Sequence, residues 1–198
     1  MTSTTPDLAP QARAVSRLVG GVADDQLDAP TPCADTPVAG LLDHLLGLTI
    51  AFRLAAEKTP LPGGPSASAE ALAPDWRDRL PRRLDDLAAA WRVPAAWAGL
   101  TEAGGVQLPA GVMGLVALNE LLVHGWDLAV ATGQPYDVDD AALAACLQLA
   151  VDTATGDPEQ RDELYGPVVP VPGDAPPLDR LLGLTGRDRA WTPAAARR

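Results

Sequence analysis

The two histidines of the chain both lie within strongly apolar segments. His44 lies in the run Leu41-Leu-Asp-His-Leu-Leu, and His124 lies in the run Asn119-Glu-Leu-Leu-Val-His-Gly-Trp-Asp. Glu120 precedes the second histidine by four residues, which is one helical turn, so both side chains would leave the same face of a helix. Two imidazoles and one carboxylate are therefore the first candidates for chemistry.

That helix face is apolar on both sides of the glutamate and histidine. Val116 and Ala117 lie one turn before the pair, and Leu128 lies one turn after it. We therefore expect the pair to point into a helical bundle, and His44 lies on an equally apolar face of its own segment. A buried glutamate costs several kcal/mol unless it is paired or bound to a cation.

His44, Glu120 and His124 predict a tripod of ligands for a divalent metal, with zinc the expected ion. Imidazole and carboxylate suit zinc, and three protein ligands leave one coordination position open for water or substrate. A metal with an open position can acidify a bound water or thiol. The alternative is a hydrogen-bonded polar cluster without metal, because a glutamate four residues before a histidine is common by chance.

The elements that must position these residues are helices. Hydrophobic periodicity predicts helices over about residues 7–22, 36–57, 75–91, 110–132 and 138–154, with a short one over 178–184. Residues 104–109 are expected to be extended, and residues 58–74 to form a long loop. The pattern predicts an all-α fold, a single domain over 1–198, built as a bundle of four main helices with a C-terminal appendage over about 156–198.

Composition narrows the classes of partner. The net charge of −11 disfavours binding to nucleic acid or to an anionic membrane surface. No apolar run is expected to reach the roughly eighteen residues of a membrane span. The N-terminus has neither the basic nor the apolar region of an export signal. Two cysteines are too few for a disulfide framework, so a cytoplasmic protein is expected.

Six different short motifs are distributed along the chain. They are Thr31-Pro-Cys-Ala-Asp, Leu41-Leu-Asp-His-Leu, Glu120-Leu-Leu-Val-His-Gly-Trp-Asp-Leu-Ala, Ala131-Thr-Gly-Gln, Tyr165-Gly-Pro and Leu184-Thr-Gly-Arg-Asp-Arg-Ala-Trp. This set resembles the DinB/YfiT-like superfamily, and more closely its actinobacterial branch related to mycothiol-dependent maleylpyruvate isomerase. The resemblance spans about residues 8–191.

The resemblance implies a DinB-like four-helix bundle with one divalent metal, usually zinc, held by His44, Glu120 and His124. It also implies mycothiol as a thiol cosubstrate, whose metal-activated sulfur would attack a small electrophile in an S-transferase or isomerase reaction. The isomerase itself carries a separate C-terminal domain, for which this chain is too short, so maleylpyruvate isomerisation is not expected.

Other polar residues near the tripod receive weaker assignments. Asp127, one turn beyond His124, or Asp43 is expected to accept a hydrogen bond from a ligand imidazole, although Asp43 equally fits a solvated carboxylate. Asn119 is expected to point away from the ligand face and has no assigned role. Cys33 is expected to be structural and Cys146 to lie in the core.

Two rival functions use the same residues. Two histidines and a carboxylate also describe non-haem iron sites that activate oxygen. A non-catalytic, stress-associated protein could bind a metal that mainly stabilises the bundle. The sequence predicts neither the electrophile nor the oligomeric state.

Overall fold

The computed structural model describes residues 5–59, 72–156, 161 and 165–193. The elements in order are α1 (Ala9–Gly21), η1 (Asp24–Gln26), α2 (Val38–Ala56), α3 (Trp76–Trp91), η3 (Pro94–Trp97), β1 (Leu100–Ala103), β2 (Val106–Pro109), α4 (Ala110–Thr132), α5 (Asp140–Thr155) and α7 (Pro177–Leu184). All six predicted helices form, with ends within two residues of the prediction. The predicted loop falls mostly on residues 60–71, outside the described residues, and the single-domain boundary stays a prediction.

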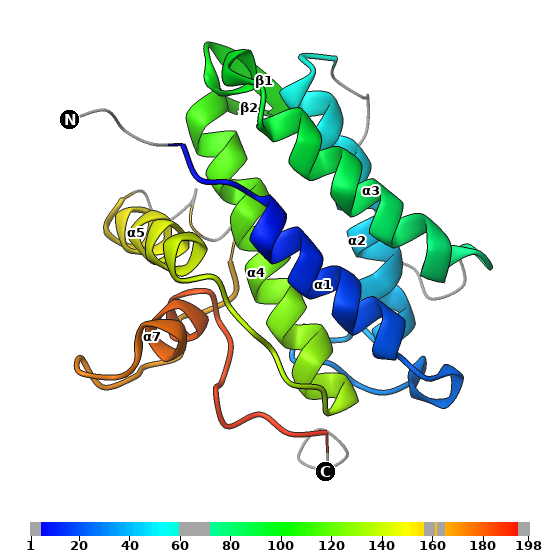
Figure 1. Cartoon of the computed structure of the whole chain (residues 1–198). Helices are drawn as coiled ribbons and strands as arrows, with labels where there is room; N and C mark the ends of the chain where they lie inside the picture. The colour runs from blue at the N-terminus through cyan, green and yellow to red at the C-terminus, as the bar shows by residue number, and fades with distance from the viewer. Residues whose placement is uncertain (1–4, 60–71, 157–160, 162–164, 194–198) are drawn as a thin grey trace.

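Helices α1 to α4 form the bundle (Figure 1). Both α1 and α2 contact α3 and α4, so α1 and α2 are diagonal partners across the core. Helix α5 packs on the outer side of α4, and α7 packs on α5. The mainly helical fold predicted from periodicity is confirmed, with the short C-terminal elements lying against the bundle.

Helices α2 and α4 are apolar on nearly every face because other elements cover them on several sides. Helix α4 contacts α1, α2 and α5, and most of its residues are buried. At 19 and 23 residues, both helices are long and apolar enough to cross a membrane by length and composition. The expectation that no segment reaches that length is therefore wrong, although most of each helix is buried within the bundle, as in any core helix.

A β-hairpin lies where a single extended stretch was predicted. Strand β1 pairs antiparallel with β2, and Ala103 lies opposite Val106 across a Gly104-Gly105 turn. Both glycines have positive φ, at 60° and 83°, which this tight turn requires. The Thr101 hydroxyl donates to the Ala55 carbonyl at the end of α2, so the hairpin is tied to that helix. The predicted extended stretch corresponds to β2, and its partner strand β1 was not predicted.

Gly114 on α4 gives a direct test of the core packing. A Cβ at this position would lie 2.5 Å from the ring of Trp97 and 2.8 Å from that of Trp91. We expect Gly114→Ala to lower the free energy of unfolding by about 1–3 kcal/mol, because these rings must move. Urea denaturation followed by tryptophan fluorescence measures this change.

Gly20→Ala on α1 is the matched control, since nothing lies within 4 Å of its added Cβ. This helical, exposed position should gain about 0.5–1 kcal/mol from the better helix propensity of alanine. Equal responses at the two glycines would contradict the packing described for α4.

Candidate metal centre and adjoining cavity

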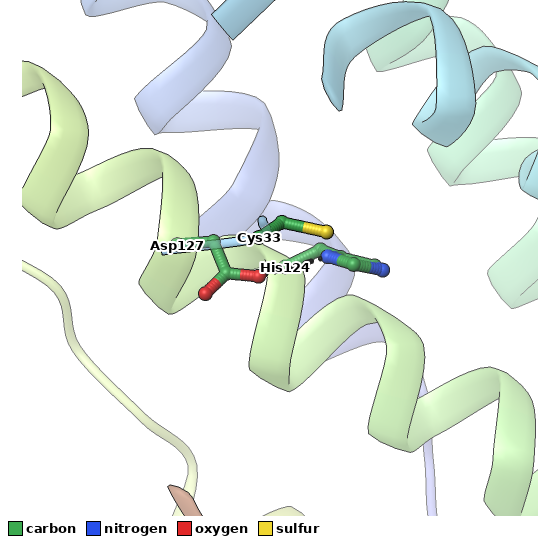
Figure 2. A group of neighbouring side chains, drawn as sticks. All are labelled: Cys33, His124 and Asp127. Atoms are coloured by element: carbon green, nitrogen blue, oxygen red, sulfur yellow. Dashed lines mark hydrogen bonds and ion pairs between the residues drawn. The ribbon is translucent and has the colours of Figure 1, made fainter. Parts of the chain in front are cut away.

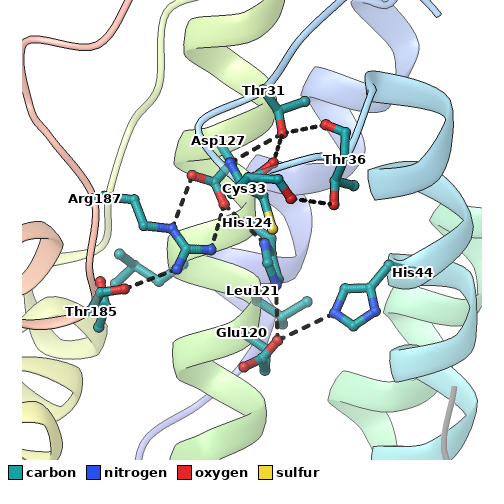
Figure 3. Close-up of polar contacts among 12 residues, drawn as sticks. Thr31, Cys33, Thr36, His44, Glu120, Leu121, His124, Asp127, Thr185 and Arg187 are labelled. Carbon is teal, nitrogen blue, oxygen red and sulfur yellow. Dashed lines mark hydrogen bonds and ion pairs between the residues drawn. The ribbon is translucent and has the colours of Figure 1, made fainter. Parts of the chain in front are cut away.

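Helices α2 and α4 bring the three predicted ligand residues together. Nε2 of His44 lies 3.7 Å from Oε2 of Glu120, and Nε2 of His124 lies 3.1 Å from the same oxygen (Figure 3). The two imidazole rings are nearly perpendicular, with centroids 4.9 Å apart. One donor atom from each residue lies within 4.8 Å of the other two. Histidines from elements far apart in sequence thus flank one carboxylate.

The pKa values of Glu120 and His124 are shifted more by their hydrogen-bonding and charged partners than by burial. Burial alone would raise the pKa of Glu120, but hydrogen bonds and charge from His124 and His44 outweigh it and hold the pKa far below its usual range. Burial alone would lower the pKa of His124, but its bonds to Asp127 and Glu120 outweigh burial and raise the pKa. Without a metal, Glu120 and His124 therefore form an ion pair at neutral pH.

The donor set also fits a divalent metal. Zinc binds nitrogen and oxygen at about 2.0–2.2 Å, so tetrahedral geometry places donor atoms about 3.4 Å apart. The two measured separations, 3.7 Å and 3.1 Å, lie on either side of that value. The cavity beside the three residues leaves room for a further ligand.

Asp127 pairs with Nδ1 of His124, the ring nitrogen that faces away from Glu120. Its Oδ2 lies 3.0 Å from Nδ1 of His124, and the carboxylate is completely buried. Arg187 donates to both carboxylate oxygens, from Nε at 3.3 Å and from Nη2 at 3.0 Å (Figure 3). An ionised acceptor at Nδ1 favours the tautomer whose Nε2 is free to bind a metal. Asp43 is half-buried and is not among the described residues that line the cavity.

Sequence reasoning gave Arg187 no role, although it lies within one of the motifs that carried the resemblance. It lies 60 residues beyond Asp127, and no helical period connects the two. Its position depends on Gly186, whose φ is 82° and where a Cβ would lie 2.9 Å from the backbone of Gly166. The Arg187 guanidinium also donates to the Thr185 carbonyl at 2.9 Å, which fixes the side chain.

Cys33 lies at the cavity wall rather than in a purely structural position. Its sulfur and donor atoms of His124 and Asp127 lie within 4.8 Å of one another (Figure 2). The Thr31 hydroxyl accepts from the Cys33 N–H at 3.2 Å and donates to the Thr36 carbonyl at 2.7 Å, which holds the loop before α2. Asp127 is already bound by the arginine and the imidazole, so this trio is less suited to a metal than the first.

A cavity of about 460 Å³ opens beside the three predicted ligands. Tyr165 and Arg187 line its polar end together with Cys33, and apolar residues of α2, α4 and the hairpin line the rest. Asn119, to which the sequence assigned no role, also lines it. Its spacing of three and four residues from Val116 and Val123, which both line the cavity, was the overlooked signal.

The Asp127–Arg187 pair generates a stability prediction. We expect Arg187→Leu to lower the free energy of unfolding by about 3 kcal/mol, because a fully buried carboxylate loses its cation. Arg189→Leu, the control, breaks a pair with Asp179 in which the arginine is half exposed, and it should cost at most about 0.5 kcal/mol. Urea denaturation measures both, and similar losses would contradict the role given to burial.

Comparison with known proteins places the chain in a family. A family model described as the mycothiol maleylpyruvate isomerase N-terminal domain matches residues 8–129, which include α1, α2, α3 and all but the last three residues of α4. Two uncharacterized proteins of Mycobacterium tuberculosis, from strains CDC 1551 / Oshkosh and ATCC 25618 / H37Rv, are each 32% identical over 187 residues. These alignments cover 88% of this chain and 92% of each relative.

Solved structures share the fold at lower identity. The crystal structure of the mycothiol-dependent maleylpyruvate isomerase aligns with a TM-score of 0.58 and 18% identity, covering 76% of this chain and 71% of that one. A histidine-to-alanine mutant of that isomerase aligns with a TM-score of 0.59 and 20% identity, covering 81% and 71%. The extent of the family match, over more than half of the chain, shows that this protein belongs to the mycothiol maleylpyruvate isomerase N-terminal domain family.

Proposed function

We propose that this protein is a metal-dependent enzyme that activates a low-molecular-weight thiol, mycothiol, for attack on a small electrophile. The observation that carries the proposal is the convergence of His44, Glu120 and His124 on one wall of a cavity. The family membership supports a mycothiol-related enzyme of isomerase type. S-conjugation and isomerisation by addition and elimination both use such a thiol.

The metal would be held by His44, Glu120 and His124, and we propose zinc. A zinc ion in this set would lower the pKa of a thiol bound at its open position, so that the thiolate persists at neutral pH. Asp127 keeps the proton of His124 on Nδ1 and leaves Nε2 facing Glu120. Arg187 pairs with the buried carboxylate of Asp127 and so holds that acceptor in place.

The residues around the centre would bind and orient the reactants. Tyr165 and Cys33 line the cavity beside the centre, and burial raises the pKa of the Tyr165 phenol, which stays a neutral hydrogen-bond donor. The apolar wall formed by α2 and α4 would exclude water from the reacting atoms. We place the reaction in the cytoplasm, where thiols are kept reduced.

Metal content is the primary test of this proposal. Purified untagged protein should hold about one zinc ion per chain, as a three-ligand site requires. His44→Ala and Glu120→Ala should remove it, and Asp127→Asn should weaken zinc affinity by about 10- to 100-fold through the loss of the acceptor behind His124. Glu57→Ala, at the exposed end of α2, is the control and should keep full occupancy.

Other outcomes of the metal measurement would favour the alternative functions. Iron in place of zinc would redirect the function toward oxygen chemistry. No metal in the wild type, even after zinc is supplied, would reduce the three residues to a buried polar cluster and overturn the proposal. Metal without turnover of any thiol and electrophile would favour a stabilising metal.

The pH dependence of the thiol reaction tests the activation itself. Uncatalysed addition of a thiol falls about tenfold per pH unit below a thiol pKa of about 8.5, because the thiolate is the nucleophile. With zinc-loaded protein and mycothiol, the rate should stay nearly constant from about pH 8 down to about pH 7. Loss of the absorbance of a conjugated ketone measures the rate. A tenfold fall over that range would contradict thiol activation.

A further inference from the structure

The cavity beside the candidate metal centre has two unlike ends. Its polar end holds the three proposed ligands, and its other end is an apolar arm between α2, α4 and the hairpin. The arm is lined by Leu48, Ala51 and Phe52 from α2, by Ala103, Val106 and Leu108 from the hairpin, and by Met113 and Val116 from α4. From His44 to Phe52 the helix rises about 12 Å, so the arm is long enough for an aryl or medium-length acyl group.

The charges at this cavity disfavour a substrate with two carboxylates. Among the described residues that line it, Arg187 is the only arginine or lysine, and Asp127 already neutralises it with two hydrogen bonds. One carboxylate could meet a bound metal, but the second would lie in the apolar arm. Burying an unpaired carboxylate there would cost more than an apolar contact returns.

Among the described residues along the arm, Asn119 is the one neutral polar side chain with a buried oxygen that has no hydrogen-bond partner. Its side chain is 2% exposed, and its Oδ1 is buried without a hydrogen-bond partner among the described residues. The residue lies next to Glu120 and shares a helical stripe with Val116 and Val123, so it lies where the polar end meets the arm. The carboxamide N–H of Asn119 can donate to the carbonyl oxygen of an uncharged ligand at this place, whereas its Oδ1 can only accept.

From these observations we propose that the substrate is an uncharged electrophile with an apolar body, of the conjugated-carbonyl class, rather than a small dicarboxylate. The body would lie in the arm, and the uncharged polar group beside Asn119 would place the reactive carbons at the candidate metal centre. The inference rests on the proposed function. In the reaction, addition of the thiol forms a C–S bond at the β-carbon, the carbon–carbon double bond becomes single, and the thiol proton ends on the α-carbon.

Binding to zinc-supplied full-length protein, without any thiol, tests the substrate class. The probes are benzylacetone, a neutral ketone that cannot add a thiol, and maleate, a small dicarboxylate. Isothermal titration calorimetry should show benzylacetone binding at least about tenfold more tightly than maleate. Only the ketone has both an apolar body that fills the arm and a neutral carbonyl oxygen that accepts from the amide of Asn119. Equal affinities, or a preference for maleate, would overturn the inference.

Two valines give a matched pair of variants for locating the bound probe. Val106 on the hairpin is 48% exposed yet lines the arm, whereas Val93 is 53% exposed and lies outside this cavity. Val106→Arg should weaken benzylacetone binding by about tenfold or more, since it places a charge in the arm, and Val93→Arg should leave it unchanged. An unchanged affinity in Val106→Arg would show that the probe binds elsewhere.

Asn119→Leu tests the polar contact separately from the arm. This variant should lower the preference for benzylacetone over butylbenzene by about fivefold to tenfold, the typical worth of one neutral hydrogen bond. An unchanged preference would remove Asn119 from the proposal. Metal content measured on the same samples distinguishes failure of the substrate class from failure of the proposed function. Full metal content with a preference for maleate would overturn only the substrate class. Absence of metal would overturn the proposed function, and the affinity for the ketone would still be measured directly.

Discussion

The buried carboxylate of Asp127 is the constraint on which the rest of the site depends. A fully buried charge is tolerated only when it is well paired, and here an imidazole and a guanidinium both lie within hydrogen-bonding distance of it. The guanidinium belongs to Arg187 in the segment after α7, so the C-terminal part of the chain must close against α4. The same pairing orients His124 toward Glu120. Stability of the C-terminal segment and geometry of the candidate centre are thus consequences of one interaction.

Helix α4 combines two demands that usually conflict. It is covered on several sides and is therefore largely apolar, yet it carries Asn119, Glu120, His124 and Asp127 within nine residues. Each charged group among them is matched by a partner from another element or by its neighbour one turn away. The division of the cavity into a polar end and an apolar arm follows, because the cavity-lining stripe of α4 runs from His124 back to Met113 and changes from charged to apolar.

Local pattern accounts for much of what the sequence predicted. Hydrophobic periodicity predicted six helices within two residues of their observed ends, and the four-residue spacing placed Glu120 and His124 on one face. These features depend on neighbours within one or two turns, which the sequence contains directly. The place of Asn119 at the cavity was not predicted, because its spacing of three and four residues from Val116 and Val123 was not considered. The partner strand of β2 was missed because four-residue strands give too short an alternation.

What the sequence by itself determined is the helical framework, the inward faces of α2 and α4, and the residue types available for a metal. The tertiary structure decided which of these meet: the approach of His44 to Glu120 across two helices, the closure of Arg187 on Asp127, and the placement of Cys33 and Tyr165 at the cavity. The two contacts join positions 60 residues apart, for Asp127 and Arg187, and 76 residues apart, for His44 and Glu120. No period along one helix encodes them, because they arise from the packing of whole elements around a common core.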